Sequence, residues 1–150
     1  MTGESLVGDM KFRIRHTMLP VSDLERTMDF YTRLLGMDIM RLRDQPEQKI
    51  RVGYLGYGSE DDGPGLELIQ TGGASEHAPM PAWPGHVAIM VSNLYRLCEA
   101  LKAEGVTFIR EPQPNRPGSP DFVAIIQDPD GYTIELNERH TLTGPPLRRI

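Results

Sequence analysis

The feature that most constrains this 150-residue chain is an internal repeat. Residues 15–24, Arg-His-Thr-Met-Leu-Pro-Val-Ser-Asp-Leu, return in altered form at residues 85–94, Gly-His-Val-Ala-Ile-Met-Val-Ser-Asn-Leu. A histidine stands second in each copy, and the offset is 86 − 16 = 70 residues. A repeat of this length indicates two similar folding units that bury their apolar faces together.

A second echo lies further along each copy. Leu66-Glu67-Leu68 in the first half corresponds to Ile134-Glu135-Leu136 in the second. The two glutamates follow their histidines by 67 − 16 = 51 and 135 − 86 = 49 residues. Each half therefore carries one histidine and one glutamate in matching places.

Apolar spacing predicts the same order of elements in each half: a strand, a helix and three further strands. In the first half, residues 12–18 alternate so that His16 points inward, and Ser22 with Glu25 has the form of a capping box before a helix that Gly36 ends. The remaining strands are expected at 38–43, 50–57 and 65–69, and in the second half at 86–91, 106–110, 122–127 and 132–137, with a helix from Leu94 to Gly105.

This order predicts an α+β fold made of two βαβββ modules. The chain is expected to form a single domain over 1–150, with modules at 12–70 and 85–138, a linker at 71–84 and a tail at 139–150. The sheets of the two modules must pair to bury both apolar faces, and the paired sheets are expected to curve into a cup.

Charge and hydropathy argue against two classes of partner, nucleic acids and membranes. A net charge of −5 and a pI near 5.3 provide no basic stripe for a phosphate backbone, so we expect no nucleic acid partner. No apolar run approaches the roughly 18 residues of a membrane span, and the first ten residues lack the order of a signal peptide, so we expect no membrane contact and a cytoplasmic location. Cys98 is the single cysteine, and its helical position predicts a core residue.

The matched residues suggest a metal site. A single inward histidine is usually a hydrogen-bonded core residue, and a lone strand glutamate is usually solvated. Four such residues at matched places in a duplication instead indicate a metal held by two imidazoles and two carboxylates. This donor set suits nickel, cobalt, zinc, iron or manganese, and it leaves positions for water or substrate. The candidate ligands are His16, Glu67, His86 and Glu135.

Several motifs resemble one known family. They are the run at residues 16–24, Asp29-Phe30-Tyr31 with Leu35-Gly36-Met37, the strand at Gly85-His86, and Asp128-Pro129-Asp130-Gly131-Tyr132 leading to Ile134-Glu135-Leu136. Over residues 12–138 they are similar to glyoxalase I (lactoylglutathione lyase) of the vicinal oxygen chelate superfamily. The resemblance implies the glyoxalase/bleomycin resistance/dioxygenase fold and a homodimer in which two chains share each metal. It also implies the same four ligands, with nickel or cobalt favoured and zinc possible.

The resemblance further implies a reaction. The hemithioacetal of methylglyoxal and a thiol such as glutathione would be isomerised to a 2-hydroxyacyl thioester, a step that detoxifies methylglyoxal, with Glu135 as the base and Glu67 as the opposing acid or base. Pro20 and Thr71 stand where the family commonly has an arginine and an asparagine that help hold glutathione, so another thiol stays open. Two alternatives remain: another metalloenzyme of the superfamily (an epimerase, isomerase or dioxygenase), and a protein that only sequesters a ligand.

Overall fold

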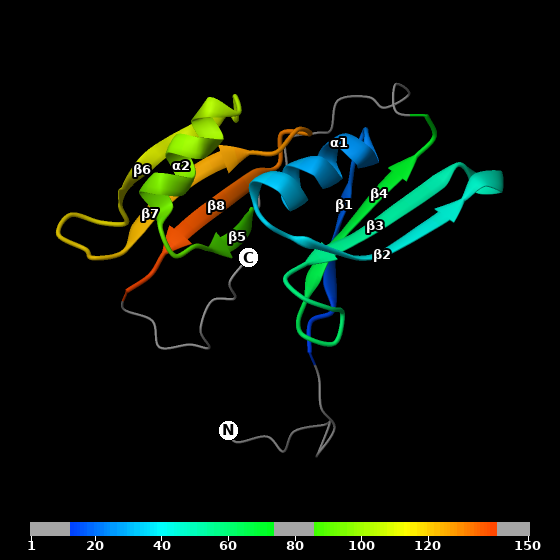
Figure 1. Ribbon diagram of the computed structural model, residues 1–150, viewed down its shortest axis with the longest axis horizontal. Helices are drawn as coiled ribbons and strands as arrows, with labels where there is room; N and C mark the ends of the chain where they lie inside the picture. Colours follow the sequence, from blue (N-terminus) through cyan, green and yellow to red (C-terminus); the bar gives the residue numbers. More distant parts are fainter. Residues whose placement is uncertain (1–12, 74–85, 141–150) are drawn as a thin grey trace, which may run out of the picture.

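The computed structural model describes residues 13–73 and 86–140. Its first module is a four-stranded mixed sheet in the order β1-β4-β3-β2, as Figure 1 shows. The parallel pair is β1 (His16–Pro20) and β4 (Gly65–Thr71), and β3 (Ile50–Gly56) and β2 (Asp38–Gln45) continue the sheet in antiparallel register. Between β1 and β2 lie α1 (Leu24–Asp29) and a π-helical turn, η1 (Phe30–Leu34), and a short 3₁₀ turn, η2 (Pro46–Gln48), joins β2 to β3.

The second module repeats this arrangement. Its sheet has the order β5-β8-β7-β6, with a parallel pair β5/β8 and antiparallel neighbours beyond it. The elements are β5 (Val87–Met90), α2 (Leu94–Ala103), β6 (Phe108–Pro114), β7 (Phe122–Gln127) and β8 (Thr133–Glu138). The two βαβββ modules confirm the predicted α+β fold, although the sheets remain separate four-stranded units in the described chain.

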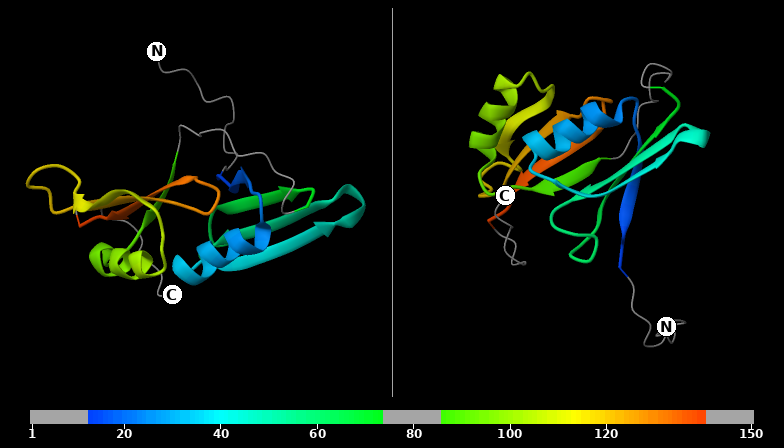
Figure 2. Two further views of the ribbon diagram at one scale, coloured as in Figure 1. Left: turned by 90° about the horizontal axis from the view of Figure 1, so that it is seen from above. Right: turned by 45° about the vertical axis from the view of Figure 1, so that its right-hand side comes forward.

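The core lies between the helices and the sheets. Figure 2 shows both helices on the same side of the two sheets. One apolar cluster contains residues of both modules, among them Tyr31, Leu68, Leu101 and Leu136, each at most 1% exposed. The side chains of Leu66 and Leu68 belong to this cluster, and Glu67 between them must point to the opposite face of β4.

The face opposite the helices is more open than the sequence predicts. The pattern placed the side chains of Ile14, His16 and Met18 inward, but Ile14 is 76% exposed and Met18 is 49% exposed. Leu19, which alternates with Met18, is the buried residue of β1. His16 therefore points to a face that no helix covers, and the prediction of a buried face there is wrong.

The start of α1 also differs from the prediction. Asp23, not Ser22, caps the helix, because its carboxylate accepts a hydrogen bond from the Arg26 amide at 3.0 Å. The Ser22 hydroxyl instead donates to Asp130 at 2.5 Å. Gly36 does end this helical segment in a left-handed conformation, with φ of 66°.

Some predicted boundaries change or remain outside the structure. The strand predicted at 106–110 is β6, which spans Phe108–Pro114 and so begins and ends later than predicted. Most of the predicted linker (71–84) and tail (139–150) lies outside the described residues. Among the helices of the described chain, none is long and apolar enough to cross a membrane.

Candidate metal centre

The first histidine and glutamate of the repeat meet on the open face of their sheet. His16 begins β1, and Glu67 lies in the neighbouring strand β4, two positions beyond the register partner of His16. His16 Nε2 is 2.8 Å from Glu67 Oε2, and the two side chains are 32% and 12% exposed. The other carboxylate oxygen, Glu67 Oε1, accepts a hydrogen bond from the Tyr54 hydroxyl at 2.6 Å. We refer to His16 and Glu67 as the first half-site.

The second module builds the same arrangement with less burial. His86 directly precedes β5, Glu135 lies in β8, and His86 Nε2 is 3.4 Å from Glu135 Oε2. The side chains are 48% and 29% exposed. Glu135 Oε1 accepts a hydrogen bond from the side-chain amide of Asn137 at 2.8 Å. His86 and Glu135 form the second half-site.

Both half-sites have the spacing that a shared ion requires. A nitrogen and an oxygen that each bind an ion at roughly 2.1 Å lie about 3.0 Å apart at a right angle and about 3.4 Å apart at a tetrahedral angle. The 3.4 Å separation in the second half-site equals the tetrahedral value, and the 2.8 Å separation in the first is slightly below the right-angle value and is that of a direct imidazole–carboxylate contact. In each half-site a neighbouring donor holds one carboxylate oxygen and leaves the other facing the imidazole nitrogen, so the donor sets fit a divalent metal.

The four predicted ligands do not converge within one chain. No group of three or more histidine, cysteine, aspartate or glutamate side chains is arranged to hold a metal within residues 13–73 and 86–140. The structure thus joins His16 with Glu67 and His86 with Glu135, and leaves the two pairs apart. A four-ligand site formed from both pairs stays a prediction, which requires a second copy of the chain.

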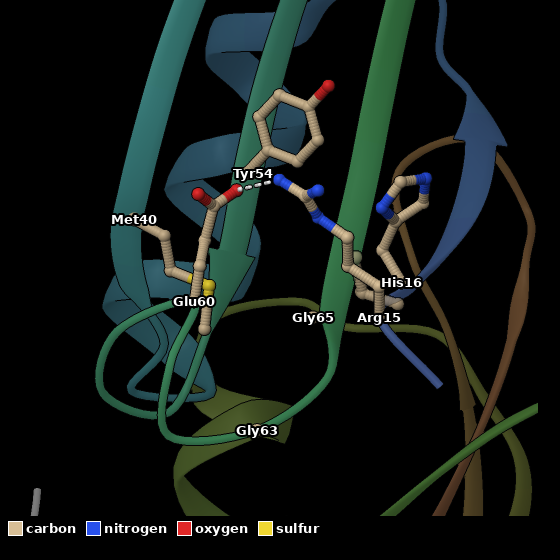
Figure 3. A pocket seen from close by; sticks show the side chains of 8 residues that line it. Arg15, His16, Met40, Tyr54, Glu60, Gly63 and Gly65 are labelled. Atoms are coloured by element: carbon tan, nitrogen blue, oxygen red, sulfur yellow. Dashed lines mark ion pairs between the residues drawn. The ribbon is translucent and has the colours of Figure 1, made fainter. Parts of the chain in front are cut away.

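Arginine and tyrosine side chains surround the first half-site. The guanidinium of Arg41 lies 3.9 Å from the centre of the Tyr54 ring, and the His16 ring meets that tyrosine edge-on at 5.8 Å. A shallow, open hollow lies beside His16 and Tyr54 and is also lined by Arg15, Met40, Glu60 and the glycines at 63 and 65 (Figure 3). Gly65 is required here, because a Cβ atom would lie 2.5 Å from the Leu55 carbonyl oxygen. No side chain therefore projects from position 65, and the sheet surface next to His16 remains open.

Two charged or polar interactions link the side chains of this region: Arg41 with Glu60, and Tyr54 with Glu67. Arg41 donates to Glu60 Oε1 from Nε at 3.3 Å and from Nη2 at 3.0 Å, and this pairing lowers the pKa of Glu60. The hydrogen bond to Glu67, together with partial burial, raises the pKa of Tyr54, so its hydroxyl is protonated at neutral pH and acts as a donor.

The sequence did not indicate Tyr54, Arg41 or Glu60 as parts of this site. The repeat could not reveal them, because the equivalent of Tyr54 in the second sheet is Ile125: Tyr54 pairs with Glu67, and Ile125 pairs with Glu135. The signal that could have found Tyr54 is the strand register, which periodicity alone does not give.

Pro20 and Thr71 lie at the ends of β1 and β4, and both are exposed. The Pro20 carbonyl accepts a hydrogen bond from the Tyr132 hydroxyl at 2.8 Å. Proline has no side-chain donor and threonine has a single short hydroxyl, so neither can make the contacts of an arginine or an asparagine.

The family of the chain follows from comparison with known sequences. The profile of the Glyoxalase/Bleomycin resistance protein/Dioxygenase superfamily matches residues 13–136, a span that contains both half-sites. The chain belongs to this superfamily. Among curated superfamily members, the probable lactoylglutathione lyase of Vibrio cholerae serotype O1 is 41% identical over 124 residues, which are 83% of this chain and 88% of that protein. The lactoylglutathione lyase of Escherichia coli O157:H7 is 40% identical over 84% of this chain and 92% of its own length.

Solved structures agree with the superfamily fold. Glyoxalase I from Zea mays superposes with a TM-score of 0.76 and 38% identity, over 85% of this chain and 44% of the maize chain. This chain thus spans less than half of that longer protein. The trypanothione-dependent glyoxalase I of Leishmania major gives a TM-score of 0.73 at 38% identity, over 85% of this chain and 87% of that one.

Proposed function

We propose that this chain is a metal-dependent lactoylglutathione lyase, a glyoxalase I. Its substrate would be the hemithioacetal of a 2-oxoaldehyde such as methylglyoxal and a thiol, and its product a 2-hydroxyacyl thioester. The observation that carries the proposal is the pair of half-sites, each with an imidazole nitrogen and a carboxylate oxygen at ligand spacing on an open sheet face. The curated relatives at about 40% identity support it.

The assembly would be a homodimer. Each half-site offers two donors, too few for a tight site for a catalytic ion, and each lies on an exposed surface. Two copies related by a twofold axis would bring His16 and Glu67 of one chain opposite the second half-site of the other, which gives two identical four-ligand sites. Neutral imidazoles and carboxylates suit nickel, cobalt or zinc, and we favour nickel or cobalt from the family resemblance. The cytoplasmic location stays a prediction.

The reaction needs stabilisation of negative charge on the substrate and transfer of a proton between two carbons. A bound divalent ion would stabilise the negative charge that develops on two adjacent substrate oxygens. Glu135 takes a proton from the carbon that carries sulfur, and a proton returns to the neighbouring carbon, so the C–H bond broken at one carbon is replaced at the next. Glu135 suits this role because it is more exposed than Glu67 and stands further from its histidine, at 3.4 Å against 2.8 Å.

The test is turnover by the protein and by a Glu135→Gln variant. The parent protein should convert the methylglyoxal–glutathione adduct, and Glu135→Gln should lower kcat by about 10² to 10⁴, because an amide cannot take a proton at neutral pH. Glu104→Gln is the matched control, since Glu104 pairs with Arg33 on the surface, and it should keep full activity.

Metal content of both variants must be measured together with turnover. Near-parental kcat in metal-loaded Glu135→Gln protein would place the base elsewhere. A parent protein that binds metal but acts on no hemithioacetal would favour another superfamily metalloenzyme, and one that binds no metal would favour ligand sequestration.

A further inference from the structure

Three arginines converge on Glu60 beside the first half-site. Arg41 holds Glu60 Oε1 through Nε and Nη2, and Arg15 Nη2 lies 3.8 Å from the same oxygen. Figure 3 shows Arg15 pointing toward Glu60, with the ion pair drawn as a dashed line. Arg13 donates to the backbone carbonyls of Asp61 and Glu60 at 2.9 and 3.1 Å, so it anchors the loop backbone and not the carboxylate.

We propose that Arg15 and Arg41 form a carboxylate-binding site for the thiol part of the substrate, and that the Glu60 side chain occupies this site in the free chain. The co-substrate would thus be a thiol that carries a carboxylate several bonds from its sulfur. The inference rests on the proposed lyase function and deepens it. Both guanidinium groups already approach one carboxylate oxygen, Glu60 Oε1, so their positions suit a carboxylate.

The position of the pair suits a substrate that also reaches the metal. Arg41 is stacked on the Tyr54 ring, and the hydroxyl of the same tyrosine bonds Glu67, so one tyrosine side chain separates the guanidinium from the first half-site. Arg15 directly precedes His16 and lines the same hollow. A planar guanidinium held by stacking is already oriented to receive a carboxylate, so little side-chain entropy is lost on binding.

Exchange of Glu60 for a substrate carboxylate requires little rearrangement. The Arg15 and Arg41 side chains are 64% and 39% exposed, and that of Glu60 is 32% exposed. Ion pairs with this exposure contribute little to stability. Since Arg13 anchors the loop backbone, Glu60 can leave by rotation of its side chain alone. Pro20 and Thr71 provide no cation, so this pair supplies the positive charge that those positions lack.

The test compares variants that should change KM in opposite directions. Arg15→Gln and Arg41→Gln should each raise KM for the methylglyoxal–glutathione adduct by about 5- to 30-fold, whereas Glu60→Gln should lower it by about 3- to 10-fold, because an internal competitor is removed. With glutathione diethyl ester, which has no carboxylate, all three variants should differ from the parent by less than about twofold. Arg43→Gln, on the same strand β2, controls for general loss of positive charge.

Structural damage would lower affinity in all three variants, so an increase of KM in Glu60→Gln overturns the inference. Equal effects on glutathione and its diethyl ester overturn it too. Calorimetric binding of S-methylglutathione to the metal-loaded protein repeats the comparison without turnover. Loss of lyase activity with every thiol would refute the proposed function, and unchanged S-methylglutathione affinity in Arg15→Gln and Arg41→Gln would refute the inference separately.

Discussion

Tyr54 and Asn137 act alike on the two candidate glutamates. Each donates a hydrogen bond to the Oε1 atom of its glutamate and leaves Oε2 toward the histidine. A carboxylate with one oxygen held by the protein presents the other to a metal in a fixed direction, which reduces the entropy lost on binding. Glu67 is the more buried of the two glutamates.

Tyr54→Phe should therefore weaken metal binding without loss of the fold. The substitution removes one hydroxyl and keeps the ring on which Arg41 stacks. We expect the metal dissociation constant to rise about 10- to 100-fold, measured by competition with a chelator. Tyr57→Phe is the matched control, because the Tyr57 hydroxyl donates to the Leu35 carbonyl away from both half-sites. Equal affinity in the two variants would show that Glu67 needs no support from Tyr54.

The sequence was sufficient to predict the candidate ligands, but it did not predict the neighbouring residues such as Tyr54. His16, Glu67, His86 and Glu135 could be inferred because the repeat places them twice. Tyr54 became visible only with the pairing of β3 and β4, since the strand pattern does not say which residues stand opposite each other.

At the scale of elements, the turn between β7 and β8 fastens the two modules. Asp130, in this turn, accepts hydrogen bonds from the Ser22 amide and hydroxyl at 2.9 and 2.5 Å and from the Thr27 hydroxyl at 2.9 Å. Asp128 in the same turn accepts a hydrogen bond from Tyr31 at 2.8 Å. The side chain of Asp130 is only 3% exposed, so these bonds are made in a protected place.

Asp130→Ala should destabilise the whole chain. The substitution leaves partly buried donors of Ser22 and Thr27 without their acceptor, and the free energy of unfolding should fall by about 2 to 4 kcal/mol. Urea unfolding measures the loss. Asp61→Ala in the exposed loop between β3 and β4 provides the comparison and should change the free energy by less than about 0.5 kcal/mol. A loss of similar size in both variants would mean that the turn does not fasten the modules.

This fastening also explains why the helix start was predicted incorrectly. Ser22 and Glu25 have the local pattern of a capping box, but the Ser22 hydroxyl bonds Asp130, 108 residues further along the chain. Asp23 takes over the cap. Element order and type followed from local periodicity, whereas this detail depended on a contact between modules that no local pattern contains.

At the scale of the whole molecule, the duplication produces two candidate half-sites per chain. In both modules the residue three positions after the site glutamate accepts from the first helical amide: Gln70 from Leu24 at 2.8 Å, and Glu138 from Leu94 at 2.7 Å. The backbone around each half-site is thus built in the same way, and the half-sites are equivalent in position. Equivalent positions in a repeated fold allow two copies to pair about a twofold axis, with each first half-site opposite a second one.

Mixing two inactive variants tests this sharing directly. His16→Ala removes the first half-site and His86→Ala the second, so each homodimer has no complete site. A mixed dimer has one site with both defects and one complete site. Random exchange makes about half of the dimers mixed, which restores about a quarter of parental activity and of tightly bound metal. His16→Ala mixed with Glu67→Gln is the control, because both defects lie in the first half-site and no complete site can form. Restoration in the control mixture, or its absence in the test mixture after proven subunit exchange, would contradict a metal centre shared between two chains.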